Sequence, residues 1–318
     1  MDIDKRNKKN IIPIVFAVDD NYAPYLAVTL KSIIENSSEN NFYKIFVLYV
    51  NLNNVNKIKI KSLEKENFEI NFLNTEKEIL TINTKLCLRD YYTNATYLRF
   101  FIPSIFTQYD KVLYLDSDLV VLDDVANLYN MDLQENLIGA VQEEVMAKMK
   151  VFGDYVEEGL GIPCEKYFNA GVMVLNVKEL RKFNVLERFL SLLKKFRFEV
   201  TQDQDYLNVL CQGRVKYLDL GFNKAPFVDE VFNDEELKII HYKLSFKPWL
   251  YDNVLYSKYF WEYAEQTPYL DEILKVKGGF TKEMKQKDEL DFKKLQQMAI
   301  EYTNSLTNYK RAISKNVV

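Results

Sequence analysis

The stretch KVLYLDSDLVVLDD at residues 111–124 places two carboxylates, Asp116 and Asp118, directly after a run of strand length. In open α/β sheets the ligand crevice lies at the carboxyl ends of the strands. Side chains at i and i+2 of an extended chain point the same way, so both carboxylates can bind one divalent cation, which removes their mutual repulsion. The alternative is a turn whose acids cap the next helix or face water, and this is commoner for an isolated D-x-D pattern.

The rest of the chain alternates apolar runs of strand length with stretches of helical period, a pattern typical of a mostly parallel sheet covered by helices. Strands are predicted at residues 11–18, 44–50, 68–73, 111–115, 137–141 and 171–176. Helices are predicted after Pro24 and at residues 55–65, 96–101, 185–196 and 203–211, the third of them stopping before Pro103. The fold class is therefore α/β.

Composition limits the function classes. A length of 318 residues suits one large α/β domain with an appendage, and the net charge of −4 argues against a nucleic-acid partner. Cys87, Cys164 and Cys211 lie far apart in apolar runs, so we expect reduced core residues. No segment reaches the roughly 20 apolar residues of a membrane span, and no secretion signal is visible. These features favour a cytoplasmic location.

The end of the chain differs in character. After Gly278 and Gly279, apolar residues recur at spacings of three and four, which predicts one apolar stripe on one helix. The stripe consists of Phe292, Leu295, Ala299, Tyr302, Leu306, Tyr309 and Ile313. From Lys277 onward the chain has nine basic and five acidic side chains. We expect one α/β domain over residues 1–276 and a helical extension over residues 277–318. The extension either packs on its own domain, forms a homo-oligomer contact, or attaches peripherally to an anionic membrane.

Three further segments carry candidate site residues. KIIHYKLSFKPW at residues 238–249 holds the only histidine, His241, which is the one imidazole that can complete a metal site, and Lys247, which can neutralise a diphosphate. YFNAGVMVLN at residues 167–176 places a predicted turn, containing Asn169, before a strand. TQDQDYLNVL at residues 201–210 places Asp203 and Gln204 at a helix start, where an acid also serves as a helix cap.

Taken together, these segments resemble the retaining glycosyltransferases of family 8, which include the bacterial lipopolysaccharide galactosyl- and glucosyltransferases and glycogenin. Two more segments belong to the likeness, FAVDDNY at residues 16–22 and TYLRF at residues 96–100. Each motif is short, but six occur in the family's order between residues 11 and 249.

The resemblance implies a GT-A fold, a Rossmann-like mixed sheet flanked by helices, here with a C-terminal helical extension. It implies a metal site for Mn²⁺ or Mg²⁺ at Asp116, Asp118 and His241, and catalytic roles for Gln204 and Asp203. The nucleotide-sugar-binding residues that it implies are Ala17, Asp19, Asn21, Tyr22, Arg99, Asp116, Ser117, Asn169, Ala170, Asp203 and Lys247. Gln204 matches the position beneath the anomeric carbon, where we expect it to stabilise charge during front-face attack by the acceptor.

The expected activity is a metal-dependent retaining hexosyltransferase that moves glucose or galactose from UDP-glucose or UDP-galactose to a glycan acceptor. The acceptor is a lipid-linked saccharide, a glycoprotein or a polymer, as in cell-surface polysaccharide or lipopolysaccharide biosynthesis, at the cytoplasmic side of a membrane. One position departs from the family, because Leu244 stands where the family often has a glycine whose backbone approaches the diphosphate. Glu143 lies in the region that matches the acceptor side.

Three other functions were weighed. A haloacid dehalogenase-type phosphatase needs D-x-D near the start of its domain and Thr or Ser two residues later, where this chain has Val120. A sugar nucleotidylyltransferase opens with a Gly-rich loop, which FAVDDNY lacks. A catalytically silent UDP-sugar-binding or scaffolding subunit is the alternative from another class, and the retention of Asp116, Asp118, His241 and Lys247 argues against it.

Overall fold

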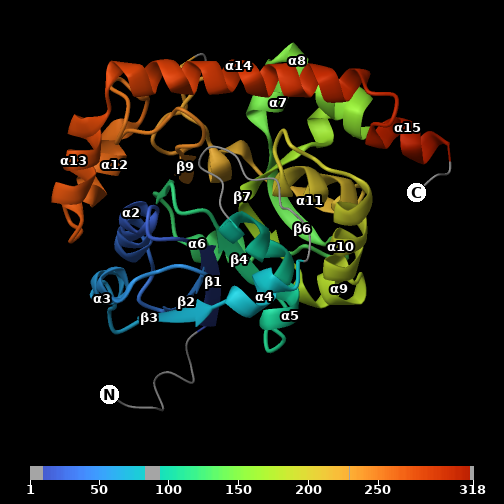
Figure 1. The fold of residues 1–318 in the computed structure, drawn as a ribbon. Coiled ribbons are helices and arrows are strands. Elements are labelled where there is room, and N and C mark those ends of the chain that lie inside the picture. Colours follow the sequence, from blue (N-terminus) through green and yellow to red (C-terminus); the bar gives the residue numbers. More distant parts are fainter. Residues whose placement is uncertain (1–9, 83–93, 229, 316–318) are drawn as a thin grey trace.

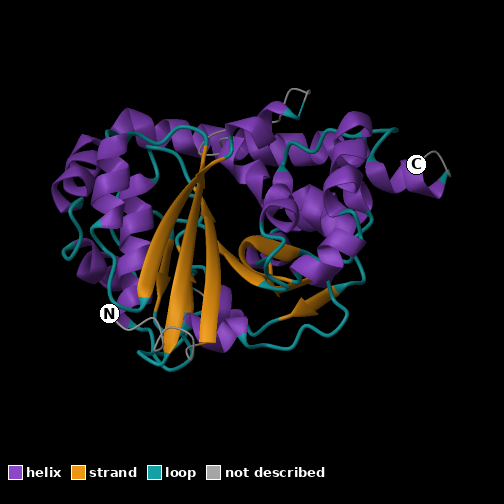
Figure 2. Ribbon diagram, turned by 90° about the horizontal axis from the view of Figure 1, so that it is seen from below, coloured by secondary structure: helices purple, strands orange, loops and turns teal. Residues whose placement is uncertain are grey.

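The computed structural model describes residues 10–82, 94–228 and 230–315, and a mixed sheet of seven strands lies at its centre (Figures 1 and 2). The strand order is β3-β2-β1-β4-β7-β6-β8, in which β7 runs antiparallel to both of its neighbours and the other pairs are parallel. The strands are β1 (Asn10–Ala17), β2 (Asn41–Tyr49), β3 (Phe68–Asn74), β4 (Val112–Leu115), β6 (Ile138–Gln142), β7 (Phe168–Leu175) and β8 (Val215–Tyr217). A second sheet pairs β5 (Leu119–Val121) with β9 (Ile239–His241).

Helices cover both faces of the sheet. One apolar cluster joins the first face to α2 (Ala23–Glu35), α3 (Asn54–Lys61), α6 (Val125–Tyr129), α12 (Ser257–Ala264) and α13 (Leu270–Gly279). The other cluster involves η1 (Asn94–Phe101), α5 (Ile102–Ile105), α7 (Glu144–Lys148), α8 (Lys150–Asp154), η2 (Tyr155–Leu160), α9 (Val177–Lys182), α10 (Val185–Lys195), α11 (Asp203–Cys211) and α14 (Lys282–Asn304). The remaining elements are α4 (Glu76–Leu80), η3 (Cys164–Lys166), η4 (Leu220–Asn223) and α15 (Tyr309–Ser314).

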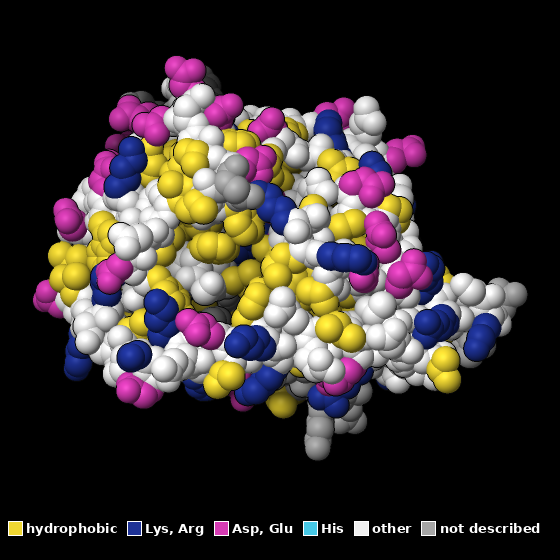
Figure 3. All heavy atoms as spheres, turned by 90° about the horizontal axis from the view of Figure 1, so that it is seen from above, with side chains coloured by type: hydrophobic (Ala, Val, Ile, Leu, Met, Phe, Trp, Pro, Cys, Tyr) yellow, Lys and Arg dark blue, Asp and Glu magenta, His cyan; other side chains and the backbone are white. Residues whose placement is uncertain are grey.

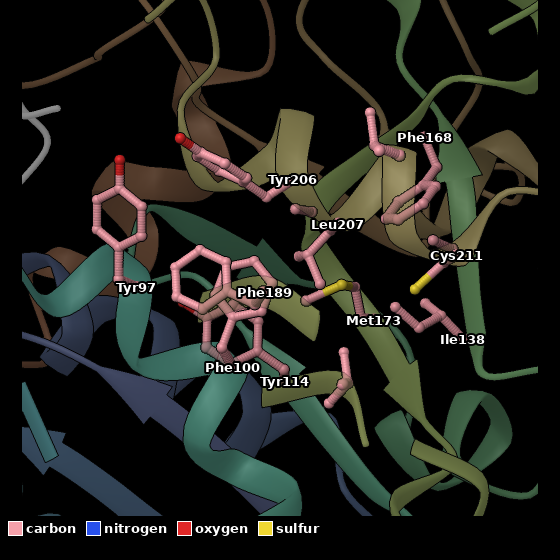
Figure 4. Packing of buried hydrophobic residues seen from close by; sticks show 14 of the residues in the cluster. Tyr97, Phe100, Tyr114, Ile138, Phe168, Met173, Phe189, Tyr206, Leu207 and Cys211 are labelled. Carbon is pink, nitrogen blue, oxygen red and sulfur yellow. The ribbon is translucent and has the colours of Figure 1, made fainter. Parts of the chain in front are cut away.

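Aromatic side chains fill the second cluster. The rings of Phe100 and Phe189 stack with their centroids 3.7 Å apart, and Tyr206 meets Phe189 edge-on (Figure 4). Met173 of β7 lies beside Leu207 of α11, and α11 packs on this strand, while α10 packs on η1 and α11. This packing fixes α11, which carries Asp203 and Gln204, relative to the strand that carries Asn169.

The strands predicted from the sequence are confirmed, with small shifts at their ends, and the short strands β5, β8 and β9 lie outside the predicted ranges. The helix predicted at residues 96–101 is η1, a 3-10 helix that ends at Phe101 as predicted, but a second helix, α5, follows it directly with Pro103 in its first turn. A proline is tolerated there because its missing N–H has no partner within the helix. The predicted turn at residues 169–171 is wrong, since these residues belong to β7 and all three are buried.

The C-terminal stripe lies on two helices rather than one. Ser305 has extended backbone angles that end α14, and the side chain of Asn308 caps α15 by accepting a hydrogen bond from the Arg311 N–H at 3.0 Å. Leu295 and Ala299 are buried against the second cluster, whereas Leu306 is 81% exposed. The stripe therefore packs in part on the chain itself, as α14 crosses the top of the molecule in Figure 1 from α12 and α13 to α8 and α15.

Two other expectations can be compared with the structure. Within the described ranges, none of the helices combines the length and the apolarity that a membrane span requires. Cys164 and Cys211 form no disulfide, while Cys87 lies outside the described residues. The division at residue 276 stays a prediction, and α13 runs through it.

We predict that Leu295→Ala lowers the free energy of unfolding by about 2–4 kcal/mol, because it empties a filled site between α14 and the core. Leu290→Ala on the same helix is the matched control, since Leu290 is 56% exposed, and we expect a change within about 0.5 kcal/mol. Urea denaturation measures both. Equal effects of the two substitutions would contradict the packing of α14 described here.

Candidate active site

The two aspartates lie in a short connection between two strands that belong to different sheets. β4 ends at Leu115, and β5 begins at Leu119 opposite His241 of β9. The buried hydroxyl oxygen of Thr29 lies 2.9 Å from the carbonyl oxygen of Ser117 and 2.8 Å from that of Leu119. The Tyr242 N–H donates to the carbonyl of Asp118 at 3.0 Å. The strand pairing therefore brings His241 to Asp118 across 123 residues of sequence.

Asp116, Asp118 and His241 form a cluster that can hold a metal ion. Each offers one ligand atom, and these atoms lie within 4.8 Å of one another. Nε2 of His241 is 3.3 Å from Oδ1 of Asp118 and 3.9 Å from Oδ2 of Asp116. The donor set of two carboxylates and an imidazole suits a divalent cation. The prediction that these three residues converge is confirmed.

Gly171 supplies the space for this cluster. A Cβ atom at that position would lie 2.3 Å from Cε1 of His241 and 2.6 Å from Oδ2 of Asp116. The Gly171 carbonyl accepts a hydrogen bond from the Asp116 N–H at 2.8 Å, so the backbone itself approaches the site closely. Any side chain here would displace one of the three candidate metal-binding groups.

Two cationic side chains pair with the aspartates in the structure, and a phenol hydroxyl donates a hydrogen bond to one of them. Nη2 of Arg99 lies 3.2 Å from Oδ1 of Asp116, which also accepts a hydrogen bond from the Tyr114 hydroxyl at 2.8 Å. Lys247, whose side chain is 3% exposed, pairs with Oδ2 of Asp118. Burial acts to raise the pKa of Asp118, but Lys247 and His241 hold it well below its ordinary value. Asp118 is therefore an anion in the folded protein.

A buried hydrogen-bond network lies beside the cluster. The Asn169 amide nitrogen donates to Glu143 and to Oε1 of Gln204, the latter at 3.2 Å. Its oxygen accepts from the Gly171 N–H at 2.9 Å and from the Asn223 amide at 2.8 Å. An amide side chain has two donors and two acceptor lone pairs, and all four of those of Asn169 are used within the protein. Asn169 therefore positions its neighbours in this state of the protein.

Asp203 differs from Asn169 in its hydrogen bonding, although it is buried in the same region. Its Oδ2 lies 3.0 Å from Nε of Arg99, but that N–H donates to the carbonyl of Thr96 at 2.9 Å, and Oδ2 accepts no hydrogen bond within the described residues. Burial raises the pKa of Asp203 to about 7; Arg99 lowers it and Asp116 raises it. A buried carboxylate oxygen that accepts no hydrogen bond costs free energy, which a hydroxyl donor from a ligand would recover.

These groups line one pocket, which opens as a hollow framed by hydrophobic side chains (Figure 3). Of the residues predicted from the sequence, those that line it are Ala17, Asp19, Tyr22, Arg99, Asp116, Ser117, Asp118, Asn169, Asp203, Gln204, His241 and Lys247. Asn21, which is exposed, and Ala170, which is buried, do not line it. Asp19 also stabilises the start of α2, because its Oδ1 accepts from the N–H groups of Asn21 and Tyr22.

Leu244 also lines the pocket and has φ of +53°, in the left-handed region that favours glycine. Leu244 therefore has a backbone conformation that glycine adopts more easily. The cost of a left-handed residue with a side chain is about 1–2 kcal/mol.

Other residues of the site were missed by the sequence interpretation. Tyr114 lies two residues before Asp116 on the same face of the strand, so the period of two could have identified it. Lys243, two residues after His241, forms a buried ion pair with Glu143 inside the pocket. Asn223 joins Asn169 to His241, and no local pattern marks it.

Comparisons with known proteins agree with this geometry. The model of glycosyl transferase family 8 matches residues 13–253. Glycosyltransferase GlyA of Streptococcus pneumoniae is 30% identical over 74% of this chain and 32% of its own length. The lipopolysaccharide 1,2-glucosyltransferase of Escherichia coli is 28% identical over 79% of this chain and 78% of its own length. The crystal structure of galactosyltransferase LgtC with donor and acceptor sugar analogues has a TM-score of 0.67, with 27% identity, and covers 81% of this chain and 96% of that one. The chain spans less than two thirds of the length of several curated relatives.

We predict that Gly171→Ala abolishes Mn²⁺ binding, because the added methyl group overlaps the positions of His241 and Asp116. Gly278→Ala is the control, since a Cβ there meets no atom within 4 Å and alanine favours the helix. Titration calorimetry with Mn²⁺ compares the two variants with the unmodified protein. Retention of full Mn²⁺ affinity by Gly171→Ala would rule out the proposed position of the ion.

Proposed function

The chain belongs to glycosyltransferase family 8, and on that basis we propose that it is a metal-dependent retaining hexosyltransferase that moves glucose or galactose from a UDP-sugar to a glycan acceptor. The observation that carries the proposal is the convergence of Asp116, Asp118 and His241 at the carboxyl end of β4, inside the pocket. One similar protein is named a glucosyltransferase and one similar structure a galactosyltransferase, which supports a hexose donor.

Asp116, Asp118 and His241 would hold the divalent ion. The open space over Gly171 and the chemistry of the donors fit such an ion, and the imidazole favours Mn²⁺ over Mg²⁺, which prefers oxygen ligands. When bound, the ion would neutralise charge on the diphosphate of the departing UDP. Asp19 and Tyr22 line the pocket after β1, where we propose that the nucleoside binds, together with Ala17 and the neighbouring Asn21.

Lys247 and Arg99 provide the fixed positive charge of the pocket. We assign Lys247 to the diphosphate, which requires its ammonium to leave the carboxylate of Asp118 with which it now pairs. Arg99 cannot move as easily, because Nη1 donates to the carbonyl of Ala170 at 2.7 Å and Nε to that of Thr96. Arg99 would therefore orient Asp116 and Asp203 and add a constant electrostatic contribution as charge develops on UDP.

The environment of Gln204 indicates by which route the sugar is transferred. Its Oε1 accepts hydrogen bonds from the Ala170 N–H at 3.0 Å and from the Asn169 amide at 3.2 Å, which occupy both lone pairs of the oxygen. An oxygen engaged in this way is a poor nucleophile. The geometry therefore supports front-face attack by the acceptor hydroxyl, with the partial negative charge of Gln204 stabilising the cationic sugar.

Asp203 is suited to bind the donor sugar. Among the residues that the structure describes, none donates a hydrogen bond to its buried Oδ2, which lies in the pocket near Arg99. A sugar hydroxyl would supply the missing donor, and a pocket built for a hydroxyl discriminates strongly against a sugar that lacks it. Ser117 and Asn169 line the same pocket, and Ala170, which does not, supports it by donating its N–H to Gln204.

The proposed place of action is the cytoplasmic side of a membrane. Support comes from α14 and α15, where Met284, Leu290 and Ile300 are exposed on a segment with more basic than acidic side chains. Such a surface suits peripheral contact with anionic lipid or with a second copy of the chain. We keep the division into a GT-A catalytic domain (residues 1–276) and a helical extension (residues 277–318) as part of the proposal.

We predict that the protein releases UDP from UDP-glucose or UDP-galactose in the presence of Mn²⁺, and that Asp118→Asn lowers this rate by at least about 100-fold. Asp154→Asn removes an acid that is 47% exposed and pairs with the exposed Lys150, so it should leave the rate unchanged. Coupled-enzyme detection of UDP provides the measurement. Release that is equally fast after chelation of all metal would refute the proposed function.

The substitution Lys247→Met distinguishes a role of Lys247 in nucleotide binding from a role in metal binding. Because Lys247 pairs with Asp118 in the absence of ligands, its removal should leave Mn²⁺ affinity unchanged or increase it. Affinity for UDP should fall about 10- to 100-fold through the loss of a charge-assisted hydrogen bond. Lys258→Met, at a site 69% exposed, serves as the control in calorimetric titrations. A variant with weaker Mn²⁺ binding and unchanged UDP binding would show that Lys247 has another role.

A further inference from the structure

We propose that Asn223 is a positioning residue, which holds His241 in the Nδ1-protonated tautomer and ties it to the sugar-binding side of the pocket. Asn223 is 2% exposed and does not line the pocket, so it does not contact substrate. Its Oδ1 lies 2.9 Å from Nδ1 of His241, and its amide nitrogen lies 2.8 Å from Oδ1 of Asn169. The inference rests on the proposed metal site.

The direction of each hydrogen bond follows from a backbone group, whose donor is not in doubt. The Gly171 N–H must donate, so the atom of Asn169 that it contacts at 2.9 Å is the oxygen. The atom of Asn223 that faces this oxygen must then be its NH₂ group, which leaves the oxygen of Asn223 facing His241. An amide oxygen only accepts, so Nδ1 of His241 carries the proton.

A second backbone group gives the same assignment. The Ala170 N–H donates to Gln204 at 3.0 Å, which identifies that atom as Oε1, and the atom of Asn169 that faces it must be the NH₂ group. Both ends of Asn169 are thus oriented independently, one through Gly171 and one through Ala170. The relay runs from His241 through Asn223 and Asn169 to Gln204.

The tautomer decides whether His241 can bind a metal ion through Nε2. With the proton on Nδ1, the Nε2 lone pair points toward Asp116 and Asp118, at 3.9 and 3.3 Å from their oxygens. Metal-binding histidines usually donate their other N–H to such a partner, and loss of the partner costs about 10- to 100-fold in metal affinity. Asn223 supplies that partner here.

The surrounding fold holds Asn223 in place. It ends η4, and the next residue, Lys224, donates its N–H to Ile239 and accepts from the His241 N–H, both at 2.9 Å. The fully buried Lys224 side chain pairs with Glu144 at 2.6 Å. Gly221 allows close packing, since a Cβ there would lie 2.2 Å from the carbonyl oxygen of Glu236. These contacts fix Asn223 beside β9, the strand that carries His241.

The chain has a single histidine, so its ring nitrogens can be observed by nuclear magnetic resonance without an assignment problem. The full chain, labelled with nitrogen-15 and saturated with Mg²⁺ in mildly alkaline solution, should show a protonated Nδ1 and an unprotonated Nε2. A neutral ring protonated on Nε2, or a doubly protonated ring, would overturn the proposal. This readout does not depend on sugar transfer, so the absence of UDP release would refute the proposed function while leaving this inference intact.

Two variants test the two contacts of Asn223, one with His241 and one with Asn169, individually. Asn223→Leu removes both, so Mn²⁺ affinity should fall about 10- to 100-fold and the preference for the Nδ1 tautomer should be lost. Asn223→Asp keeps an acceptor for Nδ1 but removes the donor to Asn169, so tautomer and Mn²⁺ affinity should persist while UDP release falls.

Asn308→Leu is the matched control. Asn308 is also fully buried and hydrogen-bonded, but it caps α15, away from the pocket. It should lower the thermal midpoint without changing the tautomer or the Mn²⁺ affinity. If Asn223→Leu behaves in the same way as this control, Asn223 has only a structural role. If it does not fold, the tautomer of the unmodified protein and the Asn223→Asp variant still decide the matter.

Discussion

The structure depends on the compensation of negative charge where β4 ends. Two aspartates separated by one residue repel each other, and the backbone of Gly171 brings a third polar group close to them. In the structure the compensation comes from Arg99 and Lys247, and His241 approaches the same carboxylates from a third part of the chain. Such convergence needs both sheets and the position of η1, which Arg99 ties to Ala170 of β7, so the charge at one turn constrains the architecture around it.

The site divides into a part that can exchange partners and a part that cannot. Lys247 forms an ion pair with Asp118, and a metal ion at Asp118 would compete with it. By contrast, Asn169 and Gln204 use their polar atoms within a buried network, and Arg99 is held by two backbone carbonyls. Preorganised groups of this kind stabilise developing charge without reorganisation during the reaction. The movable cation and the rigid network thus suit binding and chemistry respectively.

Much of this arrangement could be predicted from the sequence, and the failures have physical reasons. Apolar runs identified six of the seven strands of the main sheet, and the spacing of Asp116 and Asp118 indicated a candidate metal site, because strand period and charge are local properties. The three-residue strands β5 and β8 carry too few residues for a pattern. Residues 169–171 resembled a turn by composition, but β6 pairs with Phe168 beyond an irregularity in its register, and Asn208 bonds both backbone groups of Phe168, so β7 starts before them. Asn223 and Lys243 act through contacts with residues far away in sequence, which no local pattern reveals.

The central claim is that one divalent ion is bound by both aspartates and by the only imidazole of the chain. Electron spin echo spectroscopy of the protein with one equivalent of Mn²⁺ tests it directly, because a coordinated imidazole gives nitrogen modulation and His241 is the only histidine that can provide it. The account predicts a single bound Mn²⁺ with coupling to one imidazole nitrogen. Mn²⁺ bound without any nitrogen coupling, or spread over several weak sites, would contradict it.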